Sequence, residues 1–404
     1  MQKFFSILVS FSLALLAPGC ASVQESYSAP CVLTREQIVA IDTVIQTAVD
    51  EGLVPGVSLA LAYNGAAYQR AYGLADIESN QPVNDDTVFW VMSVNKIFTA
   101  AAVMLLAERD QLSLDDPLSR HLPDFPHGDE VTIRQLLNHT SGIREFLAQP
   151  AARRDPLLAA MRANPDYSVA ELVPYMAGMV PDLFEFEPGT SWKYSNSNYI
   201  LLGAVIESAS GESWKDFLRR NFFARLSLHD TDIDSLQDAL PNRARGYVRT
   251  EEGTFRPAGD FPRNIAGPAG SLRSTAPDLL AWQLGLMNGD VLAPESVQAM
   301  MEPVRLRDGT LVREPRPAWA AADAEYLYSY GLGFMLLDDG ARRAVGHIGN
   351  FPGFEAIVQT YPDRGLTFAV LTNRSEAATL LAPRIAGAVL EHASPSAGSA
   401  ACHR

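Results

Sequence analysis

Ser93 and Lys96 stand three residues apart in Ser93-Val94-Asn95-Lys96, directly before an apolar run that predicts a helix. On a helix, residues three apart lie on one face, a turn from each other. A serine hydroxyl is a weak nucleophile until a neighbouring base takes its proton, and an amine can be that base. The pair therefore suggests an acylation site. A helix N-cap followed by a solvated lysine would have the same sequence, so the pair alone does not decide.

Two further polar motifs lie downstream of this pair. Tyr194-Ser195-Asn196 follows it by about a hundred residues, and His347-Ile348-Gly349-Asn350 follows about 150 residues later. Phenol and imidazole groups transfer protons, and an amide side chain both donates and accepts hydrogen bonds. The Tyr194-Ser195-Asn196 motif alone would equally suit a loop turn beside a packed aromatic ring.

Taken together, Ser-x-x-Lys, Tyr-x-Asn and His-x-Gly in this order resemble the serine β-lactamase/penicillin-binding superfamily. The chain is most similar to the branch that holds class C β-lactamases, D-alanyl-D-alanine carboxypeptidases and related esterases. The resemblance covers about residues 35–392. Secondary matches support it at Leu136-Leu137-Asn138-His139-Thr140-Ser141-Gly142, Pro188-Gly189-Thr190 and Ala269-Gly270-Ser271-Leu272-Arg273-Ser274-Thr275-Ala276.

The resemblance implies a role for each matching position. Ser93 would be the acylated nucleophile, Lys96 its activating partner and Tyr194 the proton shuttle, while Asn196 would hold the acyl side chain of the substrate. The backbone N–H groups of Ser93 and Asn350 would form the oxyanion hole. We expect a nearby buried ammonium to lower the pKa of the tyrosine and make it a usable base.

The third motif differs from the class C β-lactamases, which carry lysine where this chain has His347. The histidine form resembles the peptidases of the branch. A neutral imidazole is a poorer anchor for a carboxylate, although it still hydrogen-bonds Tyr194 or substrate. We expect Gly349 to let the substrate approach its strand closely. The motif therefore favours peptides, amides or esters over antibiotics as substrates.

The elements around these motifs predict the fold. Thr34 and Gln37 form a capping box before a helical pattern, and Asn64-Gly65 joins two strands into a hairpin. Strand patterns return from Tyr330, with hairpins about 332–347 and 354–373, before a helix at 378–393. Strands at both ends and a helix-rich middle predict an α+β fold with three layers, in which helices flank one antiparallel sheet built from N- and C-terminal segments. The resemblance makes this fold β-lactamase/transpeptidase-like, with an inserted, mostly helical domain.

The predicted domain boundaries follow the same pattern. We expect a signal peptide at 1–21, a linker at 22–33, a sheet domain made of 34–80 plus 271–393, a mostly helical domain at 81–270 with Ser93 at the junction, and a tail at 394–404.

The N-terminal segment predicts export. Lys3 precedes an apolar run of signal-peptide length that is too short to span a bilayer. The residues up to Cys20 resemble a lipoprotein cleavage box, although Pro18 is unusual there. Lipidation of Cys20 and ordinary cleavage near Ala21 both remain open, so the protein would be periplasmic or anchored in the cell envelope by lipid.

The other two cysteines, Cys31 and Cys402, can form a disulfide in an oxidising compartment, the alternative being a free Cys402 in a mobile tail.

Charge and composition exclude other classes of function. The formal net charge of −15 disfavours nucleic acid as a partner. The histidines lack the spacing of metal ligands, and we expect neither a metal nor a cofactor.

We therefore expect an exported serine hydrolase, favoured as a monomer, that acts through an acyl-Ser93 intermediate on D-alanyl peptides or related amides and esters. Carboxylesterase or weak β-lactamase activity is the enzymatic alternative, and a penicillin-binding sensor lipoprotein is the non-enzymatic one.

Overall fold

The computed structural model describes residues 32–164, 167–235, 238–259, 261–313, 327–338 and 342–391. The predicted signal peptide, nearly all of the linker, the tail and all three cysteines lie outside these residues. The predictions about lipidation and about a Cys31–Cys402 bridge therefore stay predictions.

The strands of the described residues are β1 (Gly56–Tyr63), β2 (Ala66–Asp76), β3 (Gln81–Pro82), β4 (Phe89–Trp90), β5 (Asp232–Ile233), β6 (Tyr247–Arg249), β7 (Phe255–Pro257), β8 (Leu272–Ser274), β9 (Leu327–Tyr330), β10 (Met335–Asp338), β11 (Arg343–Phe351), β12 (Phe354–Tyr361) and β13 (Leu366–Thr372). The α-helices are α1 (Arg35–Asp50), α2 (Asn95–Glu108), α3 (Ile133–Leu137), α4 (Ala151–Ala163), α5 (Val169–Ala177), α6 (Asn196–Ser210), α7 (Trp214–Leu218), α8 (Ala224–Leu226), α9 (Ala276–Met287), α10 (Pro294–Met300) and α11 (Ala377–Leu390).

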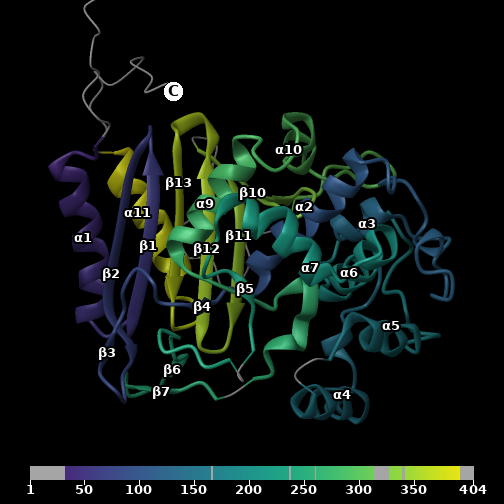
Figure 1. The fold of residues 1–404 in the computed structure, drawn as a ribbon, viewed down its shortest axis with the longest axis horizontal. Helices are drawn as coiled ribbons and strands as arrows, with labels where there is room; N and C mark the ends of the chain where they lie inside the picture. The colour runs from purple at the N-terminus through teal and green to yellow at the C-terminus, as the bar shows by residue number, and fades with distance from the viewer. Residues whose placement is uncertain are drawn as a thin grey trace, which may run out of the picture. The chain divides into compact units, whose positions relative to one another are not determined.

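One large sheet joins the two ends of the described chain (Figure 1). Its strands run in the order β3-β2-β1-β13-β12-β11-β10-β9, and every neighbouring pair is antiparallel. The N-terminal strand β1 lies directly beside the C-terminal strand β13, with Leu59 opposite Val370. The predicted α+β class is confirmed in that one antiparallel sheet, built from N- and C-terminal segments, is flanked by helices.

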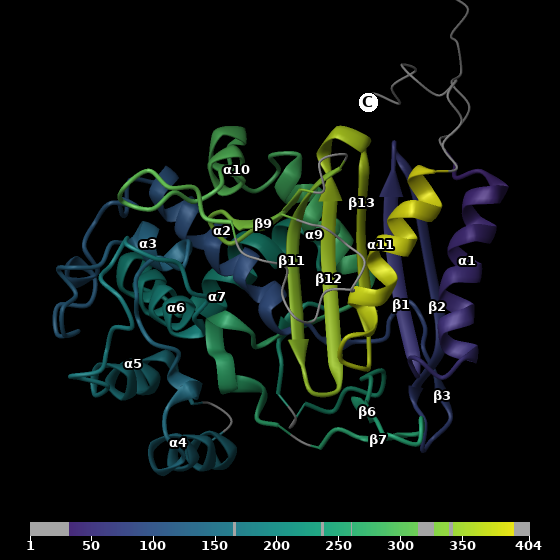
Figure 2. The same cartoon turned by 180° about the vertical axis from the view of Figure 1, so that it is seen from behind.

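Helices cover both faces of the sheet. Helix α11 packs on β12 and β13 and against α1, on the face seen in Figure 2. Helix α9 packs on β13, β1 and β12 from the opposite face. Strands β12 and β13 are buried along their whole length, as strands covered on both faces must be. The sheet is therefore the middle layer of three.

The local signals of the sequence explain these elements well. Thr34 and Gln37 form the capping box of α1, and Asn64 and Gly65 turn the β1–β2 hairpin with positive φ at both positions. The predicted hairpins after Tyr330 correspond to β10–β11 and β12–β13. The short strands β4, β8 and β5, which form a small separate sheet, were not predicted because two or three residues carry no readable alternation.

The middle of the chain is mostly helical. Helix α7 continues through a π-helical turn from Arg219 to Phe223 into α8. The proposed domain boundaries stay a prediction. Within the described ranges, no helix combines the length and the apolar character that crossing a membrane requires.

Candidate active site

A tight turn presents Ser93 at the junction between the sheet and the helices. The 3₁₀ turn Met92–Val94 precedes α2, so Ser93 stands before the helix and is not its N-cap. Met92 is buried and has a φ of 46°, a backbone conformation that costs a non-glycine residue energy. Trp90 anchors the preceding strand by donating from Nε1 to the Gly270 carbonyl at 2.8 Å. The surrounding core thus holds Ser93 in one position, next to the strained Met92.

Lys96 lies one helical turn beyond Ser93 and makes three hydrogen bonds. Its Nζ is 3.1 Å from Ser93 Oγ, 2.7 Å from Asn196 Oδ1 and 2.8 Å from the Ala269 carbonyl oxygen. The amide oxygen and the carbonyl oxygen can only accept. When Lys96 is neutral, these two acceptors take its two N–H bonds, and the lone pair is left facing the Ser93 hydroxyl. This is the arrangement that a general base for Ser93 needs.

The surroundings of Lys96 bring its pKa close to neutral pH. The side chain has no exposed surface, and burial lowers its pKa to about 7, while the charge of Glu145 acts in the opposite direction. Glu145 accepts hydrogen bonds from the backbone N–H groups of Asn196, at 2.5 Å, and Leu147, at 3.2 Å. Burial raises the pKa of this carboxyl group. A fraction of Lys96 is therefore neutral near physiological pH, which an exposed lysine is not.

Tyr194 is close to both catalytic groups, but its predicted acidity was wrong. Its hydroxyl is hydrogen-bonded to Ser93, and Lys96 Nζ lies 4.8 Å from the centre of its ring. Burial raises the pKa of Tyr194 well above its usual range, and the hydrogen bond with Ser93 offsets only part of that effect. The expected lowering by an ammonium fails because burial disfavours the phenolate. Tyr194 therefore stays protonated and has the chemistry of a proton relay, whereas Lys96 has the chemistry of a base.

Strand β11 forms the other wall of the site. A side chain at Gly349 would place its Cβ 2.1 Å from the Val91 carbonyl oxygen and 3.0 Å from Ser93 N. The glycine is therefore needed for the approach of the nucleophile turn, and not only for that of a substrate as the sequence suggested.

Strand β11 also directs the backbone N–H of Asn350 toward the edge that β10 leaves unpaired. Strand β10 pairs with β11 only up to Gly346. The Ile348 N–H points toward β10, where it meets Met335 Sδ at 3.3 Å. Because alternate N–H groups of a strand point the same way, that of Asn350 is directed to this side as well. The Asn350 side chain itself turns away and donates to Glu355 at 3.3 Å.

His347 lies beside Tyr194, with 6.3 Å between the ring centres, but it does not bond to Tyr194. Its Nδ1 is 2.8 Å from the Ile348 carbonyl, and its Nε2 is 3.0 Å from the Tyr330 hydroxyl. Burial, together with the charge of Lys96, lowers its pKa to about 3. The imidazole is therefore neutral and has both nitrogens occupied. A direct role in binding substrate stays a prediction.

The loop before α6 brings Asn196 to Lys96. His139 is fully buried beneath this loop, and its Nδ1 accepts from the Ser195 backbone N–H at 3.2 Å and from Asn198 Nδ2 at 3.1 Å. Asn196 was predicted to hold the acyl group; in the structure its amide oxygen binds Lys96. The structure thus brings Ser93, Lys96, Tyr194 and Asn196 together.

Three groups at the site were not selected from the sequence: Glu145, the Ala269 carbonyl and Tyr330. Ala269 begins one of the matching segments, so a signal existed for it. Glu145 follows another such segment by three residues, but nothing in its neighbours marks it as buried. Tyr330 reads as an ordinary strand residue.

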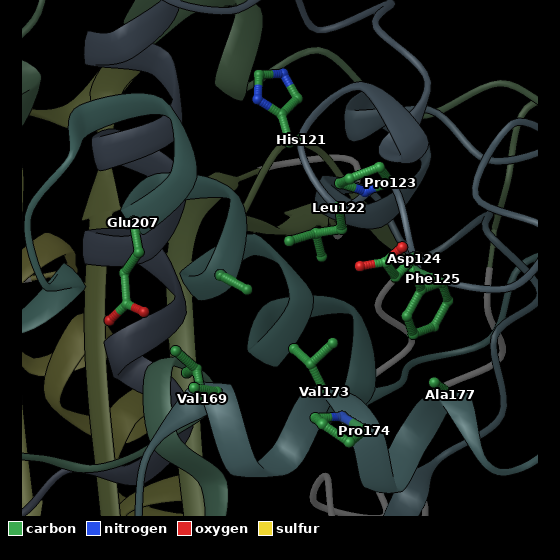
Figure 3. Close-up of a pocket in the computed structure, with 12 residues that line it drawn as sticks. His121, Leu122, Pro123, Asp124, Phe125, Val169, Val173, Pro174, Ala177 and Glu207 are labelled. Atoms are coloured by element: carbon green, nitrogen blue, oxygen red, sulfur yellow. The ribbon is translucent and has the colours of Figure 1, made fainter.

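Other features of the described residues do not compete with this site. An apolar pocket of about 540 Å³ lies between α5, α6 and the loop 121–125 and contains none of the predicted site residues (Figure 3). Two of its polar groups already have partners: His121 is 3.3 Å from Asp116, and Glu207 accepts from the Trp214 N–H. In the described ranges, no cluster of three or more histidine, cysteine or acidic residues could hold a metal ion.

The position of Glu145 gives a prediction about pH. With neutral Lys96 as the base, we expect kcat/KM to rise with pH through about 7 and then level off. The negative charge of Glu145 raises the pKa of Lys96, so Glu145→Gln should move this rise to lower pH. A pH–rate profile of both proteins measures the shift. Glu130→Gln, at a half-exposed carboxylate paired with His127, is the control; a shift to higher pH in Glu145→Gln would contradict the assignment.

Gly349→Ala should displace the nucleophile turn, because the added Cβ meets backbone atoms that cannot yield. Misplacing a reacting group by about 1 Å costs on the order of a hundredfold in rate, and overpacking costs about 1–3 kcal/mol of stability. Activity assays and thermal denaturation test both effects. In Gly387→Ala, where the nearest contact is the flexible side chain of Glu391 at 3.4 Å, both should stay near wild type.

Comparison with known proteins gives a consistent picture. The family model described as Beta-lactamase matches residues 41–390. Penicillin-binding protein 4* of Bacillus subtilis (strain 168) is 28% identical, with 83% of this chain and 72% of the relative covered. Penicillin-binding protein 4 of Amycolatopsis lactamdurans is 29% identical, covering 79% and 81%. The crystal structure of D-amino acid amidase from Ochrobactrum anthropi SV3, complexed with L-phenylalanine amide, has a TM-score of 0.74 at 25% identity and covers 88% of this chain and 98% of that one.

Proposed function

The chain belongs to the beta-lactamase family and is a serine hydrolase, and from this premise we propose that it cleaves D-amino acid amides and D-alanyl peptides through an acyl-Ser93 intermediate. The observation that carries the proposal is the set of partners of Lys96. Two groups that can only accept hydrogen bonds hold its N–H bonds, so that its lone pair faces the Ser93 hydroxyl.

The first half of the reaction follows from these positions. Lys96 takes the proton of Ser93 as Oγ attacks the carbonyl carbon of the substrate. The backbone N–H groups of Ser93 and Asn350 stabilise the negative oxygen that forms. The bond from this carbon to the leaving nitrogen or oxygen then breaks, and the proton passes to the leaving atom through the Tyr194 hydroxyl.

The second half releases the acyl group. A water molecule attacks the ester carbon while Lys96, neutral again, takes a proton from the water. The Ser93–acyl bond breaks, and Ser93 Oγ recovers the proton. Each step needs only groups that the described residues supply, together with water.

The choice of amides and peptides rests on two observations. The related crystal structure is that of a D-amino acid amidase, and two relatives are penicillin-binding proteins. The neutral, fully bonded His347 offers no cation to a substrate carboxylate, which favours amides over β-lactams and over peptides that end in a free carboxylate. Carboxylester cleavage is the second candidate, because the same acyl chemistry serves an oxygen leaving group.

Export to the periplasm or a lipid-anchored location at Cys20 belongs to this proposal as well. It rests on the charged and apolar pattern of the first twenty residues.

A panel of substrates tests the proposed function: D-alanine p-nitroanilide, its L-enantiomer, a D-Ala-D-Ala peptide, a p-nitrophenyl ester and a chromogenic cephalosporin. Intact-mass measurement should detect the acyl-enzyme. We expect the D-anilide to be cleaved faster than the L-anilide and the cephalosporin to be the poorest substrate. A protein that binds labelled penicillin without turning over any of the panel would instead be a sensor, and equal rates for both enantiomers would contradict the D-specific assignment.

A further inference from the structure

The hydrogen bonds of His347 fix the form of its ring. The Ile348 carbonyl oxygen can only accept, so Nδ1, at 2.8 Å, carries the proton. Nε2 is then an acceptor, and the Tyr330 hydroxyl, at 3.0 Å, donates to it. The Nε2 lone pair that this hydroxyl occupies is the one that a proton would take. Tyr330 thus stabilises the neutral imidazole in a single tautomer.

Tyr330 is itself held firmly. Its side chain is fully buried and packs against His139, with ring centres 4.8 Å apart, and against Trp192 at 6.0 Å. Burial raises the pKa of Tyr330 well above its usual range, so the hydroxyl stays protonated and keeps its role as a donor.

On the basis of the proposed function, we propose that Tyr330 is a specificity-determining residue: by donating to His347 Nε2 it denies the imidazole to a substrate carboxylate, and so selects acyl compounds with an uncharged leaving group. The leaving groups favoured are primary amides, anilides and neutral esters, ahead of C-terminal carboxylates such as that of a D-Ala-D-Ala peptide.

The groups around His347 make its charge state responsive to Tyr330. Lys96 faces it from α2, His139 from the segment after α3, Tyr194 from the loop before α6 and Tyr330 from β9. Of these groups, Lys96 opposes a second positive charge here. A carboxylate on the substrate would favour the protonated imidazole of His347, but only if Nε2 were not bonded to Tyr330.

Two other cations close to the nucleophile are already engaged. Lys96 is hydrogen-bonded to Ser93, Asn196 and the Ala269 carbonyl. Arg263 lies over the ring of Trp90 at 4.4 Å and pairs with Asp234 at 3.4 Å. Loss of the hydrogen bond between Tyr330 and His347 is therefore the change that would alter the preference for uncharged leaving groups.

Tyr330→Phe tests the inference, because it keeps the packed ring and removes only the donor. The substrates are the phenyl and 3-carboxyphenyl esters of D-alanine, which differ in the charge of the leaving group. Wild type should prefer the phenyl ester. In Tyr330→Phe the ratio of kcat/KM should move toward the carboxylate by roughly tenfold, the size of a hydrogen bond to a charged group. The change should be larger at about pH 6 than at about pH 8, because protonated His347 causes it.

The control is Tyr72→Phe, which removes a largely buried hydroxyl bonded to Asp42 at 2.6 Å, on the α1 side of the sheet. It should leave the ratio unchanged. An unchanged ratio in Tyr330→Phe would overturn the inference.

A second measurement uses the wild-type protein, so it stands even if the variant fails to fold. ¹⁵N spectra of the imidazoles, with His347 assigned from a His347→Gln sample, should show the Nδ1–H tautomer and no protonation down to about pH 5. An imidazolium at about pH 6 would overturn the inference. If wild type acylates neither ester, the proposed function fails, whereas the spectra still decide the state of His347.

Discussion

Replacing Ser93 with alanine is expected to remove turnover of every substrate and to abolish the covalent acyl-enzyme. Loss of the nucleophile in a comparable catalytic unit costs on the order of a million-fold in kcat, because the remaining groups cannot form the covalent intermediate. Ser93 Oγ is the atom that both Lys96 Nζ and the Tyr194 hydroxyl contact. Steady-state assays and intact-mass spectra after incubation with substrate measure the two effects.

The matched control for this variant is Ser195→Ala. Ser195 lies next to Tyr194 and is buried, but its hydroxyl has no hydrogen-bond partner among the described residues. Its removal should leave activity close to wild type. If Ser93→Ala kept substantial activity while Ser195→Ala lost it, the nucleophile would have to be reassigned.

Lys96→Met should have the second largest effect. Methionine matches the length of lysine but has no basic nitrogen, and a positioned general base contributes about 10²–10⁴-fold to the rate. The variant should also lose the rise of activity with pH through about 7. Lys193→Met is the control, because Lys193 is exposed and pairs with Glu185 at the surface. Residual activity of Lys96→Met that still rose through about pH 7 would assign the base to another group.

The same variant has a stability signature with a defined sign. Since burial lowers the pKa of Lys96 to about 7, the unfolded chain binds a proton that the native protein lacks between about pH 7 and the usual value for lysine. The free energy of unfolding of wild type should therefore rise with pH in this range. Any gain in stability of Lys96→Met over wild type at about pH 7 should shrink toward about pH 10, as urea denaturation at both pH values would measure.

The sequence was sufficient to predict the arrangement of the sheet. Alternating apolar residues and the turn at Asn64-Gly65 act locally, and local signals can be read without the rest of the chain. The ordered motifs around Ser93, Tyr194 and His347 also led to the correct family. In the structure Ser93, Lys96, Tyr194 and Asn196 indeed lie within contact of one another.

The electrostatics of the site could not be predicted in the same way. Burial raises the pKa of Tyr194, and the electrostatic influence of Tyr328, Tyr199 and Glu145 raises it further. The role of Tyr330 depends on two strands that place its hydroxyl opposite His347. Burial and long-range partners arise from packing, which sequence spacing does not show. The spacing therefore identified the site residues, but it predicted a lowered pKa for Tyr194 where burial raises it.

The pairing of β1 with β13 has a consequence for how activity arises in the cell. The Ser93 turn precedes the helical region α2–α10, whereas the Asn350 N–H belongs to β11, which follows that region. Contacts between such distant segments form late and slowly, because a long loop must close first. The site therefore assembles only after β11 has been synthesised. A chain that ends before β11 holds Ser93 without the Asn350 N–H that we propose for the oxyanion hole, so we expect hydrolysis to begin only when β11 has folded against the Ser93 turn.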